Sequence, residues 1–286
     1  MMSRVEQALK KFVSWESAEM PQSSNILSKS GRRLLKKLFL VSRPNVALRY
    51  HPVASYIKKS GLKDPSILEV GSGSIGITRY LRQKVTGIDI RFSGPKTGYL
   101  EEVTGSALEL PFEDESFDFA IALDVLEHMP PSDRAKVISE MIRIAKRSVI
   151  VGIPSGSAAE NWEEKAREFC ERKINRIKDE SKKRILLQRS NFLREHSQNG
   201  LPQESEILNH IQKTTKLFSR ASKVKVVKNQ SVLVWYMLAL GMMRLNTARW
   251  LVTAVIATMF LPLLHHLKWG GYYRKLFFVR LSDNEN

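Results

Sequence analysis

Residues 67–76 read ILEVGSGSIG, a short apolar run followed by three glycines at fixed spacing. The apolar run is typical of a buried strand, interrupted by one carboxylate at Glu69. The glycines match the pattern G-x-G-x-x-G, which in nucleotide-binding turns follows a strand and opens a helix. Glycine is needed there because the backbone turns tightly and a ligand approaches where a Cβ would intrude. The stretch predicts a strand, a ligand-binding turn and a helix over residues 75–83.

Short apolar runs separated by charged or glycine-containing segments continue beyond this turn, as expected of βαβ units with a buried parallel sheet. Strands are predicted at residues 66–70, 85–90, 99–103, 117–123 and 148–153, followed by an antiparallel pair at 223–227 and 273–281. Further helices are predicted within 32–59 and at 132–146, 162–177 and 183–196. The expected fold class is α/β: a Rossmann-like, seven-stranded, mostly parallel sheet with helices on both faces, plus a helical lid and an apolar helical hairpin insertion.

Charge is distributed unevenly along this organisation. The predicted parts are a basic N-terminal helical segment (1–63), a ligand-binding core (64–154), a helical lid (155–222) and the final two strands (223–286) with an apolar insertion at 231–267. Residues 1–63 carry 13 basic and 3 acidic side chains, whereas residues 64–153 carry 10 and 14. A mildly acidic core with basic flanks fits a catalytic unit held against an anionic surface, such as a membrane.

The apolar insertion contains two uncharged runs, residues 229–243 and 250–267. A helix of 18 residues rises about 27 Å, which is marginal for a hydrocarbon core of about 30 Å. If the last two strands are antiparallel neighbours, both ends of the insertion emerge on one side of any bilayer, so a single span is excluded. A hairpin in one leaflet, a two-span hairpin and a homodimer interface remain open.

Cysteine usage and the N-terminus indicate a compartment. Cys170 is the only cysteine, which excludes an internal disulfide framework and a multi-cysteine zinc site. No metal site is predicted. Residues 1–20 lack an apolar run of signal-peptide length. We expect a cytoplasmic protein that is peripheral or monotopic on the inner face of the membrane.

Two carboxylates frame the predicted ligand site. Asp89 ends the second strand, where it can accept hydrogen bonds from both hydroxyls of a ribose. The glycine turn and Asp89 alone would equally suit a dinucleotide enzyme. Glu69 argues against a dinucleotide enzyme, because a carboxylate in a buried strand needs a partner and the phosphates of a dinucleotide would repel it. A cationic ligand would suit Glu69.

At this point the sequence resembles the class I S-adenosylmethionine-dependent methyltransferases, in particular the small-molecule branch known as methyltransferase type 11. The motifs that carry the resemblance are E-V-G-S-G (69–73), G-I-D (87–89), L-P-F (110–112), S-F-D (116–118) and L-D-V-L-E-H (123–128). They occur in the family's order and spacing over roughly residues 48–154. The resemblance implies S-adenosylmethionine as the cofactor.

The resemblance also implies roles for individual residues. Those expected to surround the methionine part of the cofactor are Glu69, Gly71, Ser72 and Gly73. Those expected around the ribose and adenine are Asp89, Ile90, Ser106 and Ala107, with Leu123 and Asp124 at the edge of the site. Ser106 departs from the family, which often has an acidic residue there. Arg49 is a candidate for the cofactor carboxylate, with a surface salt bridge as the alternative.

The candidate catalytic residues are His128 and Asp124. If the acceptor is a hydroxyl, a base helps, and the unperturbed pKa of histidine near 6.5 suits this role. Each residue could instead cap the following helix or satisfy local backbone.

Nucleic acid is disfavoured as the acceptor. Residues 124–127 read D-V-L-E, not the Asn/Asp-Pro-Pro-aromatic motif of base amino methyltransferases, and Cys170 lies too far along for a C5-type nucleophile. Residues 192–196, FLREH, are similar to methyltransferases of surface-polysaccharide synthesis. The expected acceptor is a small molecule or a lipid-linked compound, such as a polyprenyl-linked glycan or a quinone-type lipid, at an anionic membrane surface. A soluble RNA methyltransferase and a non-catalytic cofactor-binding scaffold are the alternatives.

Overall fold

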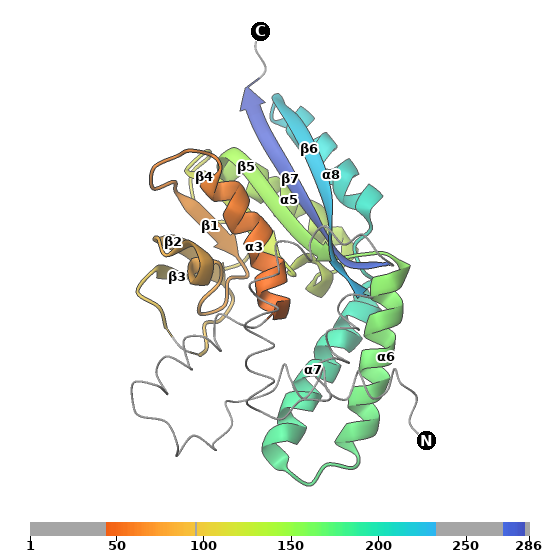
Figure 1. The fold of residues 1–286 in the computed structure, drawn as a ribbon. Helices are drawn as coiled ribbons and strands as arrows, with labels where there is room; N and C mark the ends of the chain where they lie inside the picture. The colour runs from red at the N-terminus through yellow and green to blue at the C-terminus, as the bar shows by residue number, and fades with distance from the viewer. Residues whose placement is uncertain (1–43, 95, 233–270, 284–286) are drawn as a thin grey trace. The chain divides into compact units, whose positions relative to one another are not determined.

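The computed structural model describes residues 44–94, 96–232 and 271–283 (Figure 1). Most of the predicted basic segment 1–63 and of the apolar insertion 231–267 lies outside these residues. Within the described ranges, no helix has both the length and the apolar character to cross a membrane.

Seven strands form one sheet in the order β3-β2-β1-β4-β5-β7-β6. The strands are β1 (Ile67–Val70), β2 (Val85–Asp89), β3 (Leu100–Thr104), β4 (Phe117–Leu123), β5 (Ala145–Pro154), β6 (Arg220–Ser231) and β7 (Tyr272–Asp283). Strands β1 to β5 pair in parallel, whereas β7 runs antiparallel to β5. The predicted α/β class with a mostly parallel seven-stranded sheet is confirmed.

The helices are α3 (Pro44–Lys58), α4 (Thr78–Leu81), α5 (Pro131–Ile144), α6 (Ser157–Ile174), α7 (Glu180–Asn199) and α8 (Glu204–Leu217), with a 3-10 turn η1 (Leu126–His128). By its contacts the chain divides into two compact units. The described part of the sheet unit comprises residues 49–94, 96–156, 198–229 and 274–283. The described part of the second unit comprises residues 44–48, 157–197, 230–232 and 271–273.

Helices cover both faces of the sheet unit (Figure 1). Residues from alternate positions of β4, β5 and β7 share one core with α5 and α8, including Ile138, Val149, Ile207 and Phe277. On the other face, the ring of Tyr56 from α3 lies 4.8 Å from that of Phe278. Burial of both faces explains why the central strands are apolar throughout and do not alternate with polar residues.

One helix prediction is wrong in detail, and one helix is absent from the predictions. The helix expected at residues 75–83 begins only at Thr78, because Gly76 takes a left-handed φ of +50° and the Glu69 carboxylate accepts the backbone hydrogen bond of Ile77. Helix α8, which follows the predicted stop at Gly200, was not anticipated. The guanidinium of Arg134, a residue that is only 2% exposed, donates a hydrogen bond to the Glu206 carboxylate of α8. This contact connects α8 to α5.

Candidate functional site

The glycine loop connects β1 to α4, and two of its glycines meet very different surroundings. Gly71 and Gly73 both adopt left-handed φ angles, +67° and +55°. A Cβ on Gly71 would lie 2.5 Å from a methyl group of Val125, whereas a Cβ on Gly73 would meet no heavy atom within 4 Å. Gly71 therefore lets the loop pack against the end of β4, and Gly73 leaves its backbone open to a ligand.

Glu69 lies beneath this loop and is 1% exposed. Its Oε2 accepts a hydrogen bond from the backbone N–H of Ile77 at 2.7 Å, and its side chain also bonds Tyr50. A Cβ on Gly76 would come within 2.8 Å of the carboxyl carbon of Glu69. The buried carboxylate thus has partners within the protein and ties the loop to β1.

Burial raises the pKa of Glu69 to about 7, from an ordinary value of 4.5, although the Ile77 and Tyr50 hydrogen bonds favour its ionised form. The folded protein therefore holds this proton more tightly than the unfolded chain does. The stabilising contribution is complete below pH 4.5 and is lost as the pH rises through 7.

We expect Glu69→Gln to flatten the pH dependence of stability. Relative to this variant, the ligand-free wild-type protein should lose about 1–3 kcal/mol of unfolding free energy between pH 4.5 and pH 7.5. Urea unfolding of both proteins at the two pH values measures the difference, in which the other titrating groups cancel. Equal pH dependence in the two proteins would contradict the assignment.

Asp89, the last residue of β2, contacts the backbone of the glycine loop. Its Oδ2 accepts a hydrogen bond from the backbone N–H of Gly73 at 3.0 Å, and its Oδ1 accepts one from Arg91 at 3.3 Å. Ile90, which follows directly, is 81% exposed. An isolated exposed isoleucine beside a carboxylate offers an apolar surface next to hydrogen-bond acceptors. The structure therefore brings the predicted ribose and adenine residues to the edge of the glycine loop.

The remaining predicted adenine residues follow β3. The backbone N–H of Gly105 donates to the carbonyl of Asp89 at 3.0 Å, which places this segment beside the end of β2. Ser106 is exposed, and its hydroxyl accepts a hydrogen bond from the backbone of Leu108 at 3.1 Å. Ala107 is half-buried. The Ser106 hydroxyl stabilises the local turn, and it can still donate its proton to a ligand.

Ser72 and Leu123 occupy more internal positions. The hydroxyl of Ser72 donates to the carbonyl of Gly73 at 2.9 Å and is largely buried. Leu123 ends β4 and is 3% exposed. Both residues therefore support the backbone of the loop and of the strand end.

Asp124 lies just after β4 in a left-handed conformation with φ +57°. Arg274 of β7 donates to both carboxylate oxygens, at 2.6 and 2.5 Å, and Arg49 of α3 lies 3.3 Å away. Burial alone would raise the pKa of Asp124, but Arg274 and Arg49 together hold it below its usual range. A carboxylate held ionised by two guanidiniums is a poor proton acceptor and a good anchor for neighbouring positive charge.

His128 ends the 3-10 turn η1, and it is half-buried. Its positive charge, when present, lowers the pKa of Asp124, so the two predicted catalytic residues interact electrostatically. The sequence identified both residues but not the partner Arg274, which lies 150 positions away. An arginine at position 274 is one of many in this basic chain, so the sequence does not indicate that it pairs with Asp124.

The second unit contains a buried polar cluster of its own. Helices α6 and α7 lie side by side (Figure 1), and His196 Nδ1 lies 3.0 Å from a carboxylate oxygen of Glu163. The hydroxyl of Tyr273 donates to the other oxygen at 2.7 Å. The sequence analysis singled out neither residue: His196 lies in the FLREH stretch, which was noted only for its resemblance, and Glu163 is one charge among many on an amphipathic helix.

Comparison with known proteins matches residues 68–153 to the methyltransferase domain family. A phthiotriol/phenolphthiotriol dimycocerosates methyltransferase of Mycobacterium ulcerans (strain Agy99) is 31% identical over 109 residues, which are 34% of this chain and 38% of that protein. The chloroplastic tocopherol O-methyltransferase of Arabidopsis thaliana is 29% identical over 140 residues, 44% and 38% of the two chains.

Among solved structures, magnesium protoporphyrin IX methyltransferase from Synechocystis PCC 6803 with bound SAH is similar, with a TM-score of 0.47 and 11% identity over 96% of this chain and 95% of that one. The chain spans less than half the length of the curated relatives that it matches, between 38% and 49%.

Proposed function

We propose that this chain, whose residues 68–153 match the methyltransferase domain family, transfers the methyl group of S-adenosylmethionine to a small-molecule or lipid-linked acceptor. The observation that carries this proposal is the hydrogen bond from Gly73 N–H to the Asp89 carboxylate, at a point of the glycine loop where a Cβ on Gly73 would meet no heavy atom within 4 Å. Relatives named for phthiotriol dimycocerosates and for tocopherol support an acceptor of the lipid or small-molecule class.

The residues present fit this cosubstrate. The Asp89 carboxylate has about four lone-pair positions, so it can accept from ribose hydroxyls while it holds Gly73 and Arg91. Ile90 offers an exposed apolar surface for the adenine ring. The backbone of residues 71–73 would surround the methionine part, with Glu69 beneath it. When bound, S-adenosylmethionine supplies a methyl group activated by a sulfonium.

The protein's contribution to such a transfer is alignment and exclusion of water. In the displacement, the acceptor atom forms a bond to the methyl carbon while the carbon–sulfur bond breaks and its electron pair goes to sulfur. For a hydroxyl acceptor, a base takes up the released proton, and we assign this role to His128. Asp124 then acts as a positioning residue, because its negative charge favours positive charge on the nearby imidazole.

The proposal extends to the place of reaction. We propose that the basic residues of segment 1–63 hold the protein at an anionic membrane surface, where a lipid-linked acceptor is available. A soluble RNA methyltransferase would instead require salt-sensitive RNA binding. A non-catalytic scaffold would bind the cosubstrate without any acceptor.

Calorimetry followed by a transfer assay tests the proposal. We expect binding of S-adenosylmethionine and no binding of NAD, and transfer of labelled methyl groups to a lipid or small-molecule fraction of the source cells in preference to RNA. His128→Ala should lower the turnover at least about 100-fold and leave the affinity for the cosubstrate within about twofold. Binding of NAD alone would overturn the assignment, and an unchanged turnover would remove His128 from the mechanism.

A further inference from the structure

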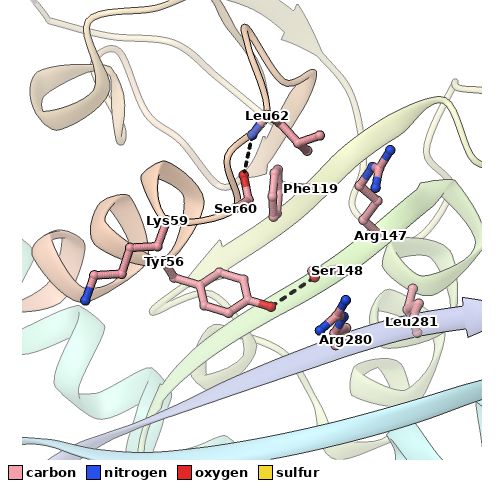
Figure 2. Close-up of a pocket in the computed structure, with 9 residues that line it drawn as sticks. All are labelled: Tyr56, Lys59, Ser60, Leu62, Phe119, Arg147, Ser148, Arg280 and Leu281. Carbon is pink, nitrogen blue, oxygen red and sulfur yellow. Dashed lines mark hydrogen bonds between the residues drawn. The ribbon is translucent and has the colours of Figure 1, made fainter.

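A hollow of about 350 Å³ (Figure 2) lies toward the end of the strands that is opposite to the glycine loop. The glycine loop follows the last residue of β1, whereas the hollow lies at Phe119, which pairs with Ile67, the first residue of β1. Phe119, Ser148 and Arg280 are direct neighbours across β4, β5 and β7 and form its floor. Its volume is within the range of small-molecule sites.

The end of α3 and the turn after it close the hollow. Tyr56 lies over the sheet, with its ring 6.3 Å from that of Phe119 and its hydroxyl 3.1 Å from Ser148 Oγ. The hydroxyl of Ser60 accepts a hydrogen bond from Leu62, which holds the turn in place (Figure 2). Because Ser148 is 3% exposed and Tyr56 packs between two aromatic rings, this wall is a fixed structure and not a chance gap between mobile side chains.

Three cationic side chains line the hollow, and no carboxylate does. Lys59 and Arg280 are exposed, and neither forms an ion pair within the described ranges. Arg147 pairs with Asp118 at 3.0 Å but keeps 53% of its side chain exposed. The Lys59 ammonium points away from the hollow, beyond Tyr56, so the charged groups that remain at the hollow are the guanidiniums of Arg147 and Arg280 (Figure 2).

A bulge explains why Arg147 reaches this place. Phe117 pairs with Ala145 and Phe119 with Ser148, so two residues of β5 oppose the single Asp118 of β4. A bulge of this kind redirects a side chain that regular pairing would send elsewhere. Two guanidiniums at a hollow that no carboxylate lines favour an anionic ligand.

We propose that this hollow binds a phosphate ester. Arg147 and Arg280 would contact the phosphate oxygens, since guanidinium groups are usual donors to phosphate. The carbon part of the ester would lie on the apolar side chains of the hollow, namely Leu62, Phe119 and Leu281. The same chemistry is offered by a soluble phosphate ester and by the headgroup of an anionic phospholipid.

The test uses the full chain and a double variant, Arg147→Gln/Arg280→Gln. A matched control, Lys213→Gln/Lys216→Gln, removes two positive charges from exposed positions of α8. The probes are inorganic phosphate and glycerol 3-phosphate by calorimetry, and vesicles of phosphatidylglycerol or phosphatidylcholine by cosedimentation, all at about 0.15 M salt. Thermal unfolding checks that all variants fold. Arg280→Lys is included as the variant that keeps the positive charge.

We expect the wild type and the control to bind glycerol 3-phosphate or phosphatidylglycerol vesicles alike, and the double variant to bind at least about tenfold more weakly. Binding of the free ester identifies a soluble ligand, and binding of the vesicles alone identifies a headgroup. Equal losses in the control and the double variant, or no binding of any probe, would overturn the proposal. Affinity for S-adenosylmethionine should stay unchanged throughout, which separates this result from the proposed function.

Discussion

Asp89→Ala is expected to lower the affinity for S-adenosylmethionine about 100-fold. The variant removes the carboxylate that accepts from Gly73 N–H at 3.0 Å and that we propose also accepts from the ribose hydroxyls. Hydrogen bonds to a charged group contribute about 1.5–3 kcal/mol each, so the loss of one or two corresponds to this factor. Titration calorimetry measures the affinity.

Glu101→Ala is the matched control for this variant. It makes the same change in charge at an exposed position of the neighbouring strand β3, and we expect it to leave the affinity unchanged. Asp89→Asn should lie between the two, because it keeps an acceptor oxygen but loses the charge. An Asp89→Ala variant that binds as tightly as the wild type would show that the cosubstrate does not use this strand end.

Arg274→Gln is expected to lower the free energy of unfolding by about 3–5 kcal/mol. Arg274 is 1% exposed and donates two hydrogen bonds to Asp124, so its removal leaves a largely buried carboxylate that keeps only the more distant contact with Arg49, at 3.3 Å, and the charge of His128 when protonated. Breaking a buried pair by removing one partner has this magnitude because the other charge stays without compensation. Urea unfolding near pH 7 measures the change.

The control is Arg147→Gln, which breaks the exposed pair with Asp118 and should change the stability by at most about 1 kcal/mol. Adding Asp124→Asn to Arg274→Gln should recover part of the loss, because asparagine tolerates the left-handed backbone and carries no charge. The effect should also shrink at acidic pH. Because the pKa of Asp124 is lower in the folded protein than in the unfolded chain, its ionised form stabilises the fold at pH values above the pKa of the unfolded chain. This stabilisation is lost as the pH falls through the pKa of the folded protein. Equal destabilisation by Arg147→Gln and Arg274→Gln would contradict the argument.

Local patterns predicted the central strands well. β1, β2 and β4 begin and end within one residue of the expected bounds, because burial on both faces leaves a continuous apolar run that charged turns interrupt. β6 extends from Arg220 to Ser231, well beyond the expected 223–227. The residues of β6 on either side of 223–227 are mostly polar, so no apolar run predicts them as part of a strand. Hydrogen bonds to the neighbouring strand hold them in the sheet.

The start of α4 illustrates a different limit. The periodicity of residues 75–83 predicts a helix, but the first turn is lost to a contact between Glu69 and Ile77 N–H. That contact depends on the buried position of the carboxylate at the end of β1. Helical propensity is a weak preference, and a buried hydrogen bond to a charged group outweighs it.

By itself the sequence determined the class of fold, the glycine loop and the position of Asp89 at a strand end, because each depends on residues that are close together in the chain. Only the tertiary structure decided which charges meet: Arg274 with Asp124, Tyr50 with Glu69, and the cations around Phe119 and Ser148. These contacts follow from the antiparallel register of β7 against β5 and from the packing of α3 on the sheet. Register and packing depend on the summed burial of many side chains, which no local pattern of residues specifies.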